Sequence, residues 1–325
     1  MKICVYGAGA VGGLIAGKLA QADHDVSVVA RGAQLTAILR DGLKIEHDGK
    51  QTAIRLKANN DPEKLGAQDC VIVAVKGQSL PDVAAGIAPL LGEGTSIVTA
   101  MNGVPWWFFD RLAFGGGKLH LESLDPGGAL SRAMPTDRIV GCIVHLSAST
   151  PEPGLIRHNM GNRLILGEPG GRNTARTTGV AGALRGAGFE VVESGFIEKD
   201  FWVKLLGNVS FNPVSALTLA TADRLLADRY VKDYMVAIMR ECLAIGRAVG
   251  VDADIDPEVR MDMARHLGVF KTSMLQDLEA GKRLEIDGLL SGTLEIARKA
   301  GVPAPFTESL AGLARLRAES TRQYP

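Results

Sequence analysis

The sequence predicts an α/β fold in which an N-terminal doubly wound sheet of the Rossmann type is followed by an all-helical C-terminal domain. Three observations support this prediction. A short apolar strand, Lys2–Tyr6, leads directly into a glycine-rich turn and a helical apolar pattern. Continuous apolar runs at Cys70–Val75 and Ser96–Thr99 are typical of parallel strands that are covered on both faces. After residue 195 apolar residues recur only at helical spacing.

Two domains are expected, because a chain of 325 residues exceeds the usual size of a single hydrophobic core. We place the first at residues 1–195 and the second at residues 196–325. Asp48-Gly49 predicts a hairpin turn, and Asp256-Pro257 and Asn212-Pro213 each predict the cap and first residue of a helix. Further predicted elements are strands at Ile139–Leu146, Gly154–His158, Arg163–Leu166 and Glu190–Glu193, and helices at Asn173–Arg185, Tyr230–Val249, Leu284–Ala300 and Thr307–Ala318.

Composition excludes several classes of partner. Thirty-six basic and 36 acidic residues give zero net charge, so no global attraction to nucleic acid or to an anionic membrane is expected. No apolar run is long enough to span a bilayer, and the N-terminus lacks the features of a signal peptide. The six histidines show no metal-binding spacing, so no metal is expected. Four scattered cysteines predict a reduced, cytoplasmic protein.

The glycine-rich turn predicts dinucleotide binding. In its G-x-G-x-x-G pattern, Gly7 allows the tight turn, Gly9 lets the backbone approach a pyrophosphate, and Gly12 lets the helix pack closely on the strand. The free N–H groups at the start of that helix face the phosphates. The pattern alone is weak, but the strand before it and the helix after it give the expected context. The predicted cofactor-binding residues here are Gly7, Ala8, Gly9, Ala10, Val11 and Gly12.

Arg31 selects among the nicotinamide cofactors. It stands after the predicted second strand, Asp25–Ala30, where NAD-binding units carry an acidic residue for the ribose hydroxyl. A guanidinium at this place suits a 2′-phosphate, because it offers paired donors and a permanent charge. A simple surface arginine is the alternative. We predict NADP(H) in preference to NAD(H).

Two polar residues follow the ends of predicted parallel strands. Lys76 comes after Cys70–Val75, and Asn102 comes shortly after Ser96–Thr99. Ligands of open α/β sheets bind at the carboxyl ends of the strands, so both residues are candidates for the cofactor site. Ordinary turn chemistry is the alternative for both.

Residues 201–217 form one of the most apolar stretches of the chain, yet Lys204, Asn208 and Asn212 interrupt it at intervals of four. On a helix this spacing places successive residues on one face. Buried polar groups are costly unless they are paired, so these side chains need a partner in protein, water or substrate. The alternative is that the lysine extends to solvent while the asparagines cap or cross-link helices.

The segment from 104 to 138 is harder to interpret. Pro105–Phe109 is a dense aromatic patch, and glycines at 115–117 and 127–128 indicate a long loop. Adjacent tryptophans can line a pocket or a subunit contact, but core packing fits the pattern equally well.

Together these residues resemble the ketopantoate reductase (2-dehydropantoate 2-reductase) family. The resemblance runs in order over nearly the whole chain. The resemblance is specific because the motifs KLxxNxxxNP, SMLQD and EID all follow a glycine-rich turn of the nucleotide-binding type. The matching pieces are GAGAVGG at 7–13, Arg31, Lys76, Asn102-Gly103, KLxxNxxxNP at 204–213, SMLQD at 273–277, Glu285-Ile286-Asp287 and GVPAP at 301–305.

The resemblance implies NADPH-dependent reduction of 2-dehydropantoate to (R)-pantoate, a step of pantothenate and coenzyme A biosynthesis, in a cleft between the two domains. In this scheme Lys204 is the general acid and Glu285 holds the substrate hydroxyl or keto oxygen. Ser273 would bind the carboxylate, and Lys76 and Asn102 would border the nicotinamide. Other polar groups of the substrate would be bound by Asn208 and Asn212, beside Asn102. The implied partner is a small 2-keto acid, and a homodimer stays open.

Elementary chemistry supports these roles. Hydride addition to a ketone leaves an alkoxide, which a nearby ammonium stabilises and protonates. Desolvation on the apolar face of 201–217 favours proton release by Lys204, whereas Glu285 favours its charged form. Glu285 and Ser273 also have plain structural alternatives, as a first-turn carboxylate and a helix N-cap.

Two functions other than 2-dehydropantoate reduction would also fit parts of the sequence. The first is a related reductase of a bulkier 2-keto acid or an opine-type imine, because Trp106-Trp107 and the following loop could reshape the pocket. The second is a catalytically silent NADPH-binding regulator, which the joint presence of Lys204, Asn208, Ser273 and Glu285 argues against.

Overall fold

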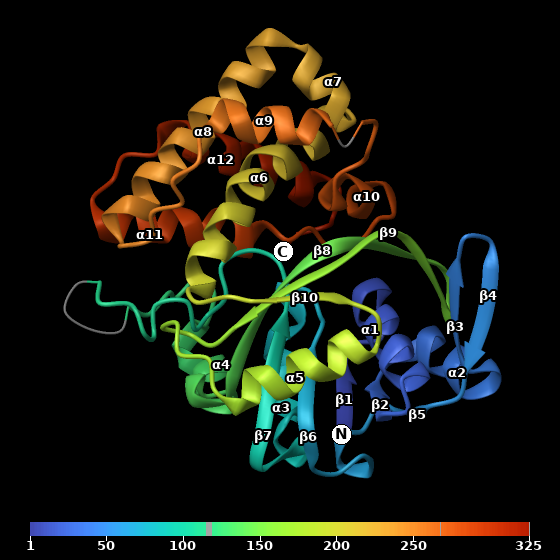
Figure 1. The fold of residues 1–325 in the computed structure, drawn as a ribbon. Helices are drawn as coiled ribbons and strands as arrows, with labels where there is room; N and C mark the ends of the chain where they lie inside the picture. Colours follow the sequence, from blue (N-terminus) through green and yellow to red (C-terminus); the bar gives the residue numbers. More distant parts are fainter. Residues whose placement is uncertain (115–118, 267, 325) are drawn as a thin grey trace. The chain divides into compact units, whose positions relative to one another are not determined.

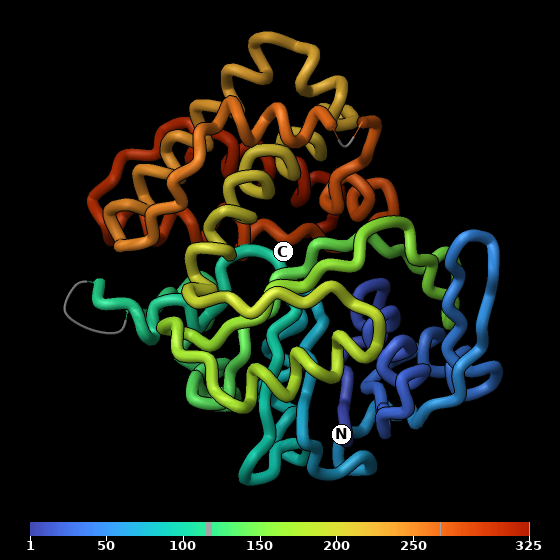
Figure 2. The backbone as a smooth tube through the Cα atoms, viewed as in Figure 1, coloured from blue at the N-terminus to red at the C-terminus, as the bar shows by residue number. Residues whose placement is uncertain are grey.

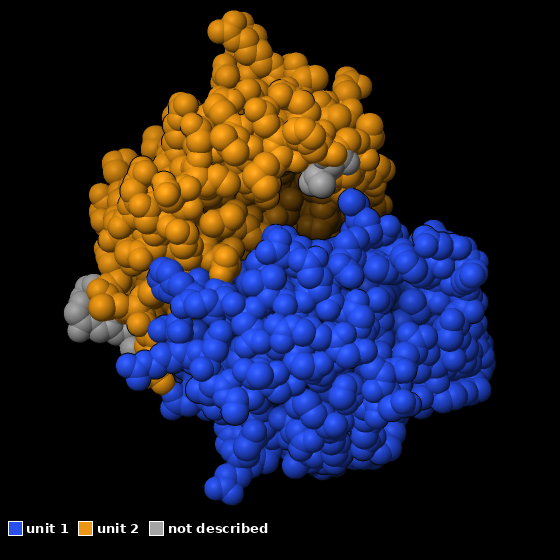
Figure 3. Space-filling model, viewed as in Figure 1, with its two compact units in different colours: residues 1–101, 128–197 blue, residues 102–127, 198–325 orange. Residues whose placement is uncertain are grey.

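The computed structural model describes residues 1–114, 119–266 and 268–324. The chain divides into two compact units, which Figure 3 colours blue and orange. Unit 1 comprises Met1–Met101 and Gly128–Ile197, and unit 2 comprises Asn102–Gly127 and Glu198–Pro325. The sequence-based division put all of residues 1–195 in one domain, so it differs from the structure in the placement of 102–127. The predicted glycines at 115–117 lie outside the described residues.

Unit 1 is built on one mixed sheet (Figure 1). Within the described residues the sheet has 10 strands in the order β4-β3-β9-β8-β7-β6-β1-β2-β5, with β10 pairing to β9. Strands β2, β1, β6, β7 and β8 run parallel, whereas β8 and β9 are antiparallel. The strands are β1 (Lys2–Tyr6), β2 (Asp25–Val29), β3 (Leu43–His47), β4 (Lys50–Ile54), β5 (Lys57–Asn59), β6 (Gln68–Val73), β7 (Leu91–Ala100), β8 (Ile139–Glu152), β9 (Leu155–Gly167) and β10 (Glu190–Glu193).

Helices cover both faces of this sheet, as the predicted doubly wound fold requires. One face packs its buried residues, such as Val5 and Ile72, against α1 and α5. The alternate residues Cys4 and Val71 are also buried, so the opposite face is covered too. The helices of unit 1 are α1 (Ala10–Gln21), α2 (Gly32–Asp41), α3 (Leu80–Gly86), α4 (Ala129–Ala133) and α5 (Ala175–Gly186).

The predicted Asp-Gly turn joins two antiparallel strands in the structure. Strands β3 and β4 pair in antiparallel register from Leu43 to Ile54 and lie side by side in Figure 2. The two turn residues Asp48 and Gly49 have φ values of 50° and 73°, the left-handed region that an Asp-Gly turn supplies. The predicted two-residue hairpin is confirmed.

Strand lengths were predicted less well. Gly154–His158 and Arg163–Leu166 were expected to be separate strands, but both belong to the single strand β9. The polar residues between them continue the strand because they pair with β8, with register shifts near His145 and Ser147. A polar, exposed stretch gives no periodicity signal, although its backbone hydrogen bonds are still satisfied.

Unit 2 is helical and confirms most of the predicted helices. Asp256 caps α9 through its side chain, and Thr272 caps α10. The predicted helix at Leu284–Ala300 is divided, since a π-helix over Asp287–Ser291 precedes α11. The α-helices are α6 (Ile197–Thr218), α7 (Ala222–Ala227), α8 (Arg229–Ala248), α9 (Pro257–Arg265), α10 (Ser273–Glu279), α11 (Gly292–Ala300) and α12 (Pro305–Ser320). None of the described helices is long and apolar enough to cross a membrane.

The prediction that Asn212-Pro213 begins a new helix is wrong. Helix α6 continues through Pro213 to Thr218. An internal proline removes one backbone hydrogen bond and costs about 3 kcal/mol. Residues on several sides of the helix, including Trp202, Leu206, Val209 and Val214, are nevertheless buried. Tertiary packing of this apolar surface therefore outweighs the local preference.

The aromatic patch explains why 102–127 belongs to unit 2. Trp107 and Phe108 are fully buried and lie against α6. The Trp107 ring meets Phe201 edge-on at 5.5 Å, and the Phe108 ring lies 5.6 Å from Trp202. Large aromatic side chains contribute most to core energetics, so they fix the segment on the helical unit. The core-packing alternative for this patch is the one the structure shows.

Candidate active site

Helix α6 carries the three polar residues expected of an active site. Lys204, Asn208 and Asn212 lie at intervals of four on this helix and therefore on neighbouring turns of one face. Asn212 is buried, and the other two are half-buried. Among the described residues none makes a hydrogen bond with the Asn208 amide, which leaves both its donor and its acceptor open to a ligand.

Lys204 is held by Asn102. Its Nζ donates to the Asn102 Oδ1 at 2.7 Å, although the two residues are 102 positions apart. Asn102 comes two residues after strand β7 and belongs to unit 2. Both residues were candidates from the sequence, but their pairing was not foreseen. The contact uses a donor of the ammonium and so fixes the position of this group.

A π-helix that begins two residues after Glu285 contacts the segment after Asn102. Backbone contacts join Gly103 to this helix, because the Val104 N–H donates to the Gly288 carbonyl at 2.9 Å. Gly103 has φ +78°, and a Cβ there would lie 2.5 Å from the Gly288 oxygen, so this close approach requires glycine. Glu285 is half-buried and precedes the π-helix by two residues. Single π-turns are frequent at functional sites.

Ser273 is the first residue of α10, where Thr272 and not Ser273 is the N-cap. The N-cap alternative for Ser273 is therefore wrong. Its Oγ accepts a hydrogen bond from the Asn212 Nδ2 at 3.3 Å. The side chain is exposed. The structure thus brings together two of the predicted substrate-binding residues.

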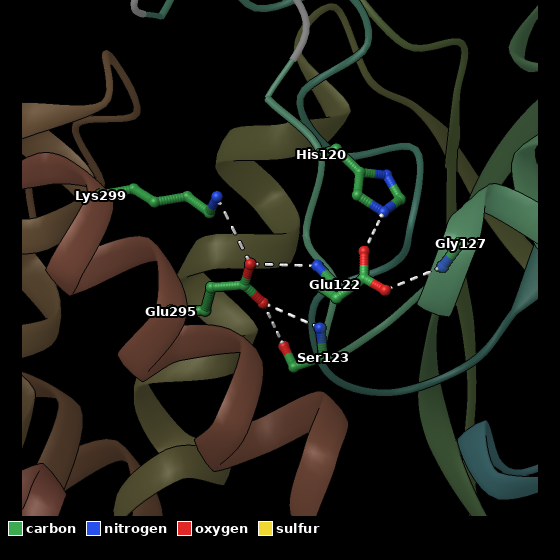
Figure 4. A network of polar contacts seen from close by, with 6 residues as sticks. All are labelled: His120, Glu122, Ser123, Gly127, Glu295 and Lys299. Atoms are coloured by element: carbon green, nitrogen blue, oxygen red, sulfur yellow. Dashed lines mark hydrogen bonds and ion pairs between the residues drawn. The ribbon is translucent and has the colours of Figure 1, made fainter.

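A buried carboxylate anchors the loop that follows Asn102. Glu295 on α11 accepts hydrogen bonds from the backbone N–H groups of Glu122 and Ser123 at 3.0 and 2.9 Å, and from the Ser123 Oγ at 2.6 Å (Figure 4). Lys299 lies 3.6 Å from the same carboxylate. Burial raises the Glu295 pKa, but these hydrogen bonds and the lysine charge outweigh burial and hold the pKa below its usual value.

We expect Glu295→Gln to destabilise unit 2 by about 2–3 kcal/mol near neutral pH, since hydrogen bonds to a charged acceptor are lost. A lowered folded-state pKa stabilises the protein above the ordinary glutamate pKa, and this contribution disappears as the pH falls through the folded value. Urea denaturation at neutral and acidic pH measures the effect, and the difference between wild type and variant should shrink in acid.

Glu319→Gln is the matched control for Glu295→Gln, because the Glu319 carboxylate pairs at the surface with Arg315, at 3.6 Å. Its denaturation midpoint should match wild type at both pH values. A Glu295→Gln protein as stable as wild type at neutral pH would contradict the anchoring role.

In unit 1 the glycine-rich turn has the shape that a dinucleotide needs. Gly7 has φ +106°, and a Cβ there would lie 2.6 Å from the Val75 Cγ1. A Cβ at Gly12 would lie 2.9 Å from the Ala74 Cβ, whereas one at Gly9 would meet nothing within 4 Å. The turn is therefore packed tightly behind Gly7 and Gly12 and open at Gly9. Helix α1 begins at Ala10, and its first N–H groups have no partner within the helix.

Gln34 supports this turn and was not foreseen from the sequence. Its Nε2 donates to the Ala8 carbonyl at 2.6 Å, and its Oε1 accepts from the Gly154 N–H at 2.9 Å. No local motif marks a residue that acts through backbone groups so far away in the sequence. Gln34 thus fixes the first half of the glycine-rich turn.

Arg31 stands at the N-cap of α2, directly after β2 and Ala30. Its Nη1 donates to the Asp82 Oδ2 at 2.9 Å, and both side chains are about 60% exposed. The sequence showed no neighbouring carboxylate, because Asp82 comes from α3. The hydrogen bond to Asp82 raises the pKa of Arg31, and the Tyr6 hydroxyl lies against the same guanidinium. Lys76 is half-buried at the N-cap of the 3₁₀ turn after β6.

Comparisons with known proteins agree with this arrangement. Residues 3–107 match the family described as ketopantoate reductase PanE/ApbA, and residues 197–318 match its C-terminal family. A 2-dehydropantoate 2-reductase from Mesorhizobium japonicum is 43% identical over 97% of this chain and 97% of its own. Another, from Halobacterium salinarum, is 28% identical over 97% of this chain and 98% of its own.

Solved structures give the same result. A Ralstonia solanacearum protein assigned provisionally as a ketopantoate reductase superposes with a TM-score of 0.96, at 46% identity and 99% coverage of each chain. D-mandelate dehydrogenase superposes with a TM-score of 0.85 at 18% identity and 99% coverage of each chain, a likeness that shows the fold alone. Family profiles that match both parts of the chain, and a relative 43% identical over nearly its full length, show that this chain belongs to the ketopantoate reductase family of oxidoreductases.

Proposed function

We propose that the protein catalyses the NADPH-dependent reduction of the C2 ketone of 2-dehydropantoate to (R)-pantoate, in pantothenate and coenzyme A biosynthesis. The observation that carries the proposal is the 2.7 Å contact between Lys204 and Asn102, on the helix that also presents Asn208 and Asn212. The names of the relatives at 43% and 28% identity point to the same substrate.

Lys204 is the proton donor in this proposal. NADPH supplies the hydride that adds to C2. As the C2–oxygen double bond opens, negative charge collects on the oxygen, and the Lys204 ammonium stabilises and then protonates it. Asn102 accepts a hydrogen bond from that ammonium and so holds it in place. The lysine regains its proton from water, which balances the step.

The other residues hold the substrate. Glu285 accepts a hydrogen bond from the substrate hydroxyl, and its negative charge favours the protonated form of Lys204. Asn208 offers an open amide, and Asn212 and Ser273 form a joined polar pair at the far end of the same face. These are groups of the kind that bind a small hydroxylated acid.

The cofactor proposal rests on unit 1. The residues Gly7–Gly12 would hold the pyrophosphate at the start of α1, since the turn is open at Gly9. Arg31 would bind the 2′-phosphate, which distinguishes NADPH from NADH. Lys76 would lie near the nicotinamide end, as would Asn102.

A bulkier keto acid or an imine as substrate has less support. That reading required the aromatic patch to line the substrate pocket. Trp106, Trp107, Phe108 and Phe109 are instead each at most 5% exposed and belong to the core. Core packing therefore explains the aromatic patch, and the patch does not favour a bulkier keto acid or an imine as substrate.

An NADPH-oxidation assay over a panel of 2-keto acids and imines tests the function. The highest kcat/KM is expected for 2-dehydropantoate. A substantially higher value for another compound would replace the substrate, and NADPH binding without any turnover would favour the regulator.

We also propose a cytoplasmic location. All four cysteines are buried and unpaired with one another. Burial raises the pKa of Cys4 to about 11, so this thiol stays protonated and unreactive at neutral pH.

A further inference from the structure

An arginine outside the expected site residues lies against α6, at the edge of the face that carries Lys204. Arg260, on α9, is half-buried, and its guanidinium lies over Gly207. A Cβ at Gly207 would lie 2.7 Å from the Arg260 Nη2 and 3.3 Å from its Cζ. The guanidinium therefore occupies the space that any other residue at position 207 would fill.

Arg260 lacks the partner that a buried charge normally has. Within the described part of the chain, its guanidinium makes no hydrogen bond or ion pair. Arg265 on the same helix is more exposed and pairs with Asp262 at 2.6 Å. Burial lowers the pKa of Arg260, but a guanidinium keeps its proton in proteins. Partial burial weakens the hydration of this charge, so an anion that arrives from outside would be favoured there.

The position of this charge fits one part of the substrate. Gly207 follows Lys204 by three residues and precedes Asn208 by one. Residues three apart are neighbours on a helix surface, so the guanidinium lies beside the residue proposed to protonate the C2 oxygen. In a 2-keto acid the carboxylate carbon is bonded directly to C2. A group that holds the carboxylate must therefore lie next to the proton donor.

We propose that Arg260 binds the carboxylate of the 2-keto acid. This inference rests on the proposed function and adds a residue that sets substrate class. A guanidinium presents paired N–H donors that match a carboxylate, and the contact selects acids over neutral ketones. Ser273, which family resemblance assigns to the carboxylate, lies beside Asn212, about 7.5 Å along the helix axis from Gly207. Ser273 would then meet the opposite end of the substrate.

The test compares 2-dehydropantoate with its methyl ester, which lacks the charge. Arg260→Gln should lower kcat/KM for the acid by about 10- to 100-fold, mainly through KM, and change the value for the ester by less than about threefold. Arg260→Lys should recover part of the loss, because it keeps the charge but not the paired donors. Arg265→Gln is the matched control on the same helix and should behave as wild type.

Gly207→Ala keeps the arginine and moves it. Alanine is favoured over glycine inside a helix, and the clash is with the end of a flexible side chain, so this variant should fold. Its preference for the acid over the ester should fall in the same direction as in Arg260→Gln. If acid and ester lose activity together, or if only NADPH affinity changes, the inference is wrong. It is equally wrong if Ser273→Ala, and not Arg260→Gln, removes the preference for the acid.

Binding separates this inference from the proposed function. In the presence of NADP⁺, pantoate should raise the melting temperature of wild type more than uncharged pantolactone does, and Arg260→Gln should abolish the difference. If wild type reduces no keto acid yet shows this dependence, the function fails and the inference stands. If wild type reduces 2-dehydropantoate and Arg260→Gln keeps the preference for the acid, the function stands and the inference fails. A wild type that pantoate does not stabilise would also overturn the inference.

Discussion

Lys204→Ala is expected to lower kcat by about 10²- to 10⁴-fold, the usual contribution of a positioned general acid. The alkoxide that forms at C2 would then lose both its nearest charge and its proton source. The NADPH dissociation constant should change by less than about twofold, because Lys204 is not among the predicted cofactor contacts, most of which lie in unit 1. Steady-state kinetics together with fluorescence titration of NADPH measures both quantities.

Lys199→Ala is the control, since Lys199 lies on the same helix but on a different face from Lys204. It should leave kcat unchanged. Asn102→Ala should give an intermediate loss of about tenfold in kcat, because the ammonium remains but loses the amide that orients it. An unaltered kcat in Lys204→Ala would remove this residue from the chemistry.

The second large effect is expected at Arg31. Arg31→Ala should weaken NADPH binding by about 10- to 100-fold, since a charge-assisted pair with the 2′-phosphate is lost. NADH affinity should change little, because NADH lacks that phosphate. Calorimetric titration with both cofactors measures the ratio. Equal losses for the two cofactors would refute the role of Arg31.

Asp82 forms an ion pair with Arg31 that the sequence does not reveal, because the two residues are far apart in the chain. It holds the Arg31 guanidinium at 2.9 Å and must share or release it when a phosphate binds. Exposed ion pairs contribute at most about 1 kcal/mol, so Asp82→Asn should tighten NADPH by about fivefold or less and leave NADH unaffected. Arg40→Ala, which removes an exposed pair with Asp41, should alter neither affinity.

Local features of the fold could be predicted because neighbouring residues determine them. The glycine pattern at 7–12, the Asp48-Gly49 turn and the Asp256-Pro257 helix start each depend on the backbone preferences of a few residues. The four-residue spacing of Lys204, Asn208 and Asn212 likewise implies a common helix face wherever that helix lies.

Predictions from local sequence failed at two places, because tertiary packing there outweighs the preferences of neighbouring residues. The Asn212-Pro213 pair predicted the start of a new helix, yet α6 continues through both residues because its apolar surface is buried. The aromatic residues at 106–109 gave no periodic signal, and their burial against Phe201 and Trp202 decides that 102–127 belongs with the helices.

The sequence alone determined the residue types of the site and the helix and turn that carry them. Only the tertiary structure decided which of them meet: Lys204 with Asn102, Asn212 with Ser273, Arg31 with Asp82, and Arg260 with the gap left by Gly207. The physical reason is the range of the forces involved. Turn and helix preferences act over a few residues, whereas contacts between distant residues follow from burial of apolar surface, which is non-directional and is compatible with many partners until the whole fold is formed.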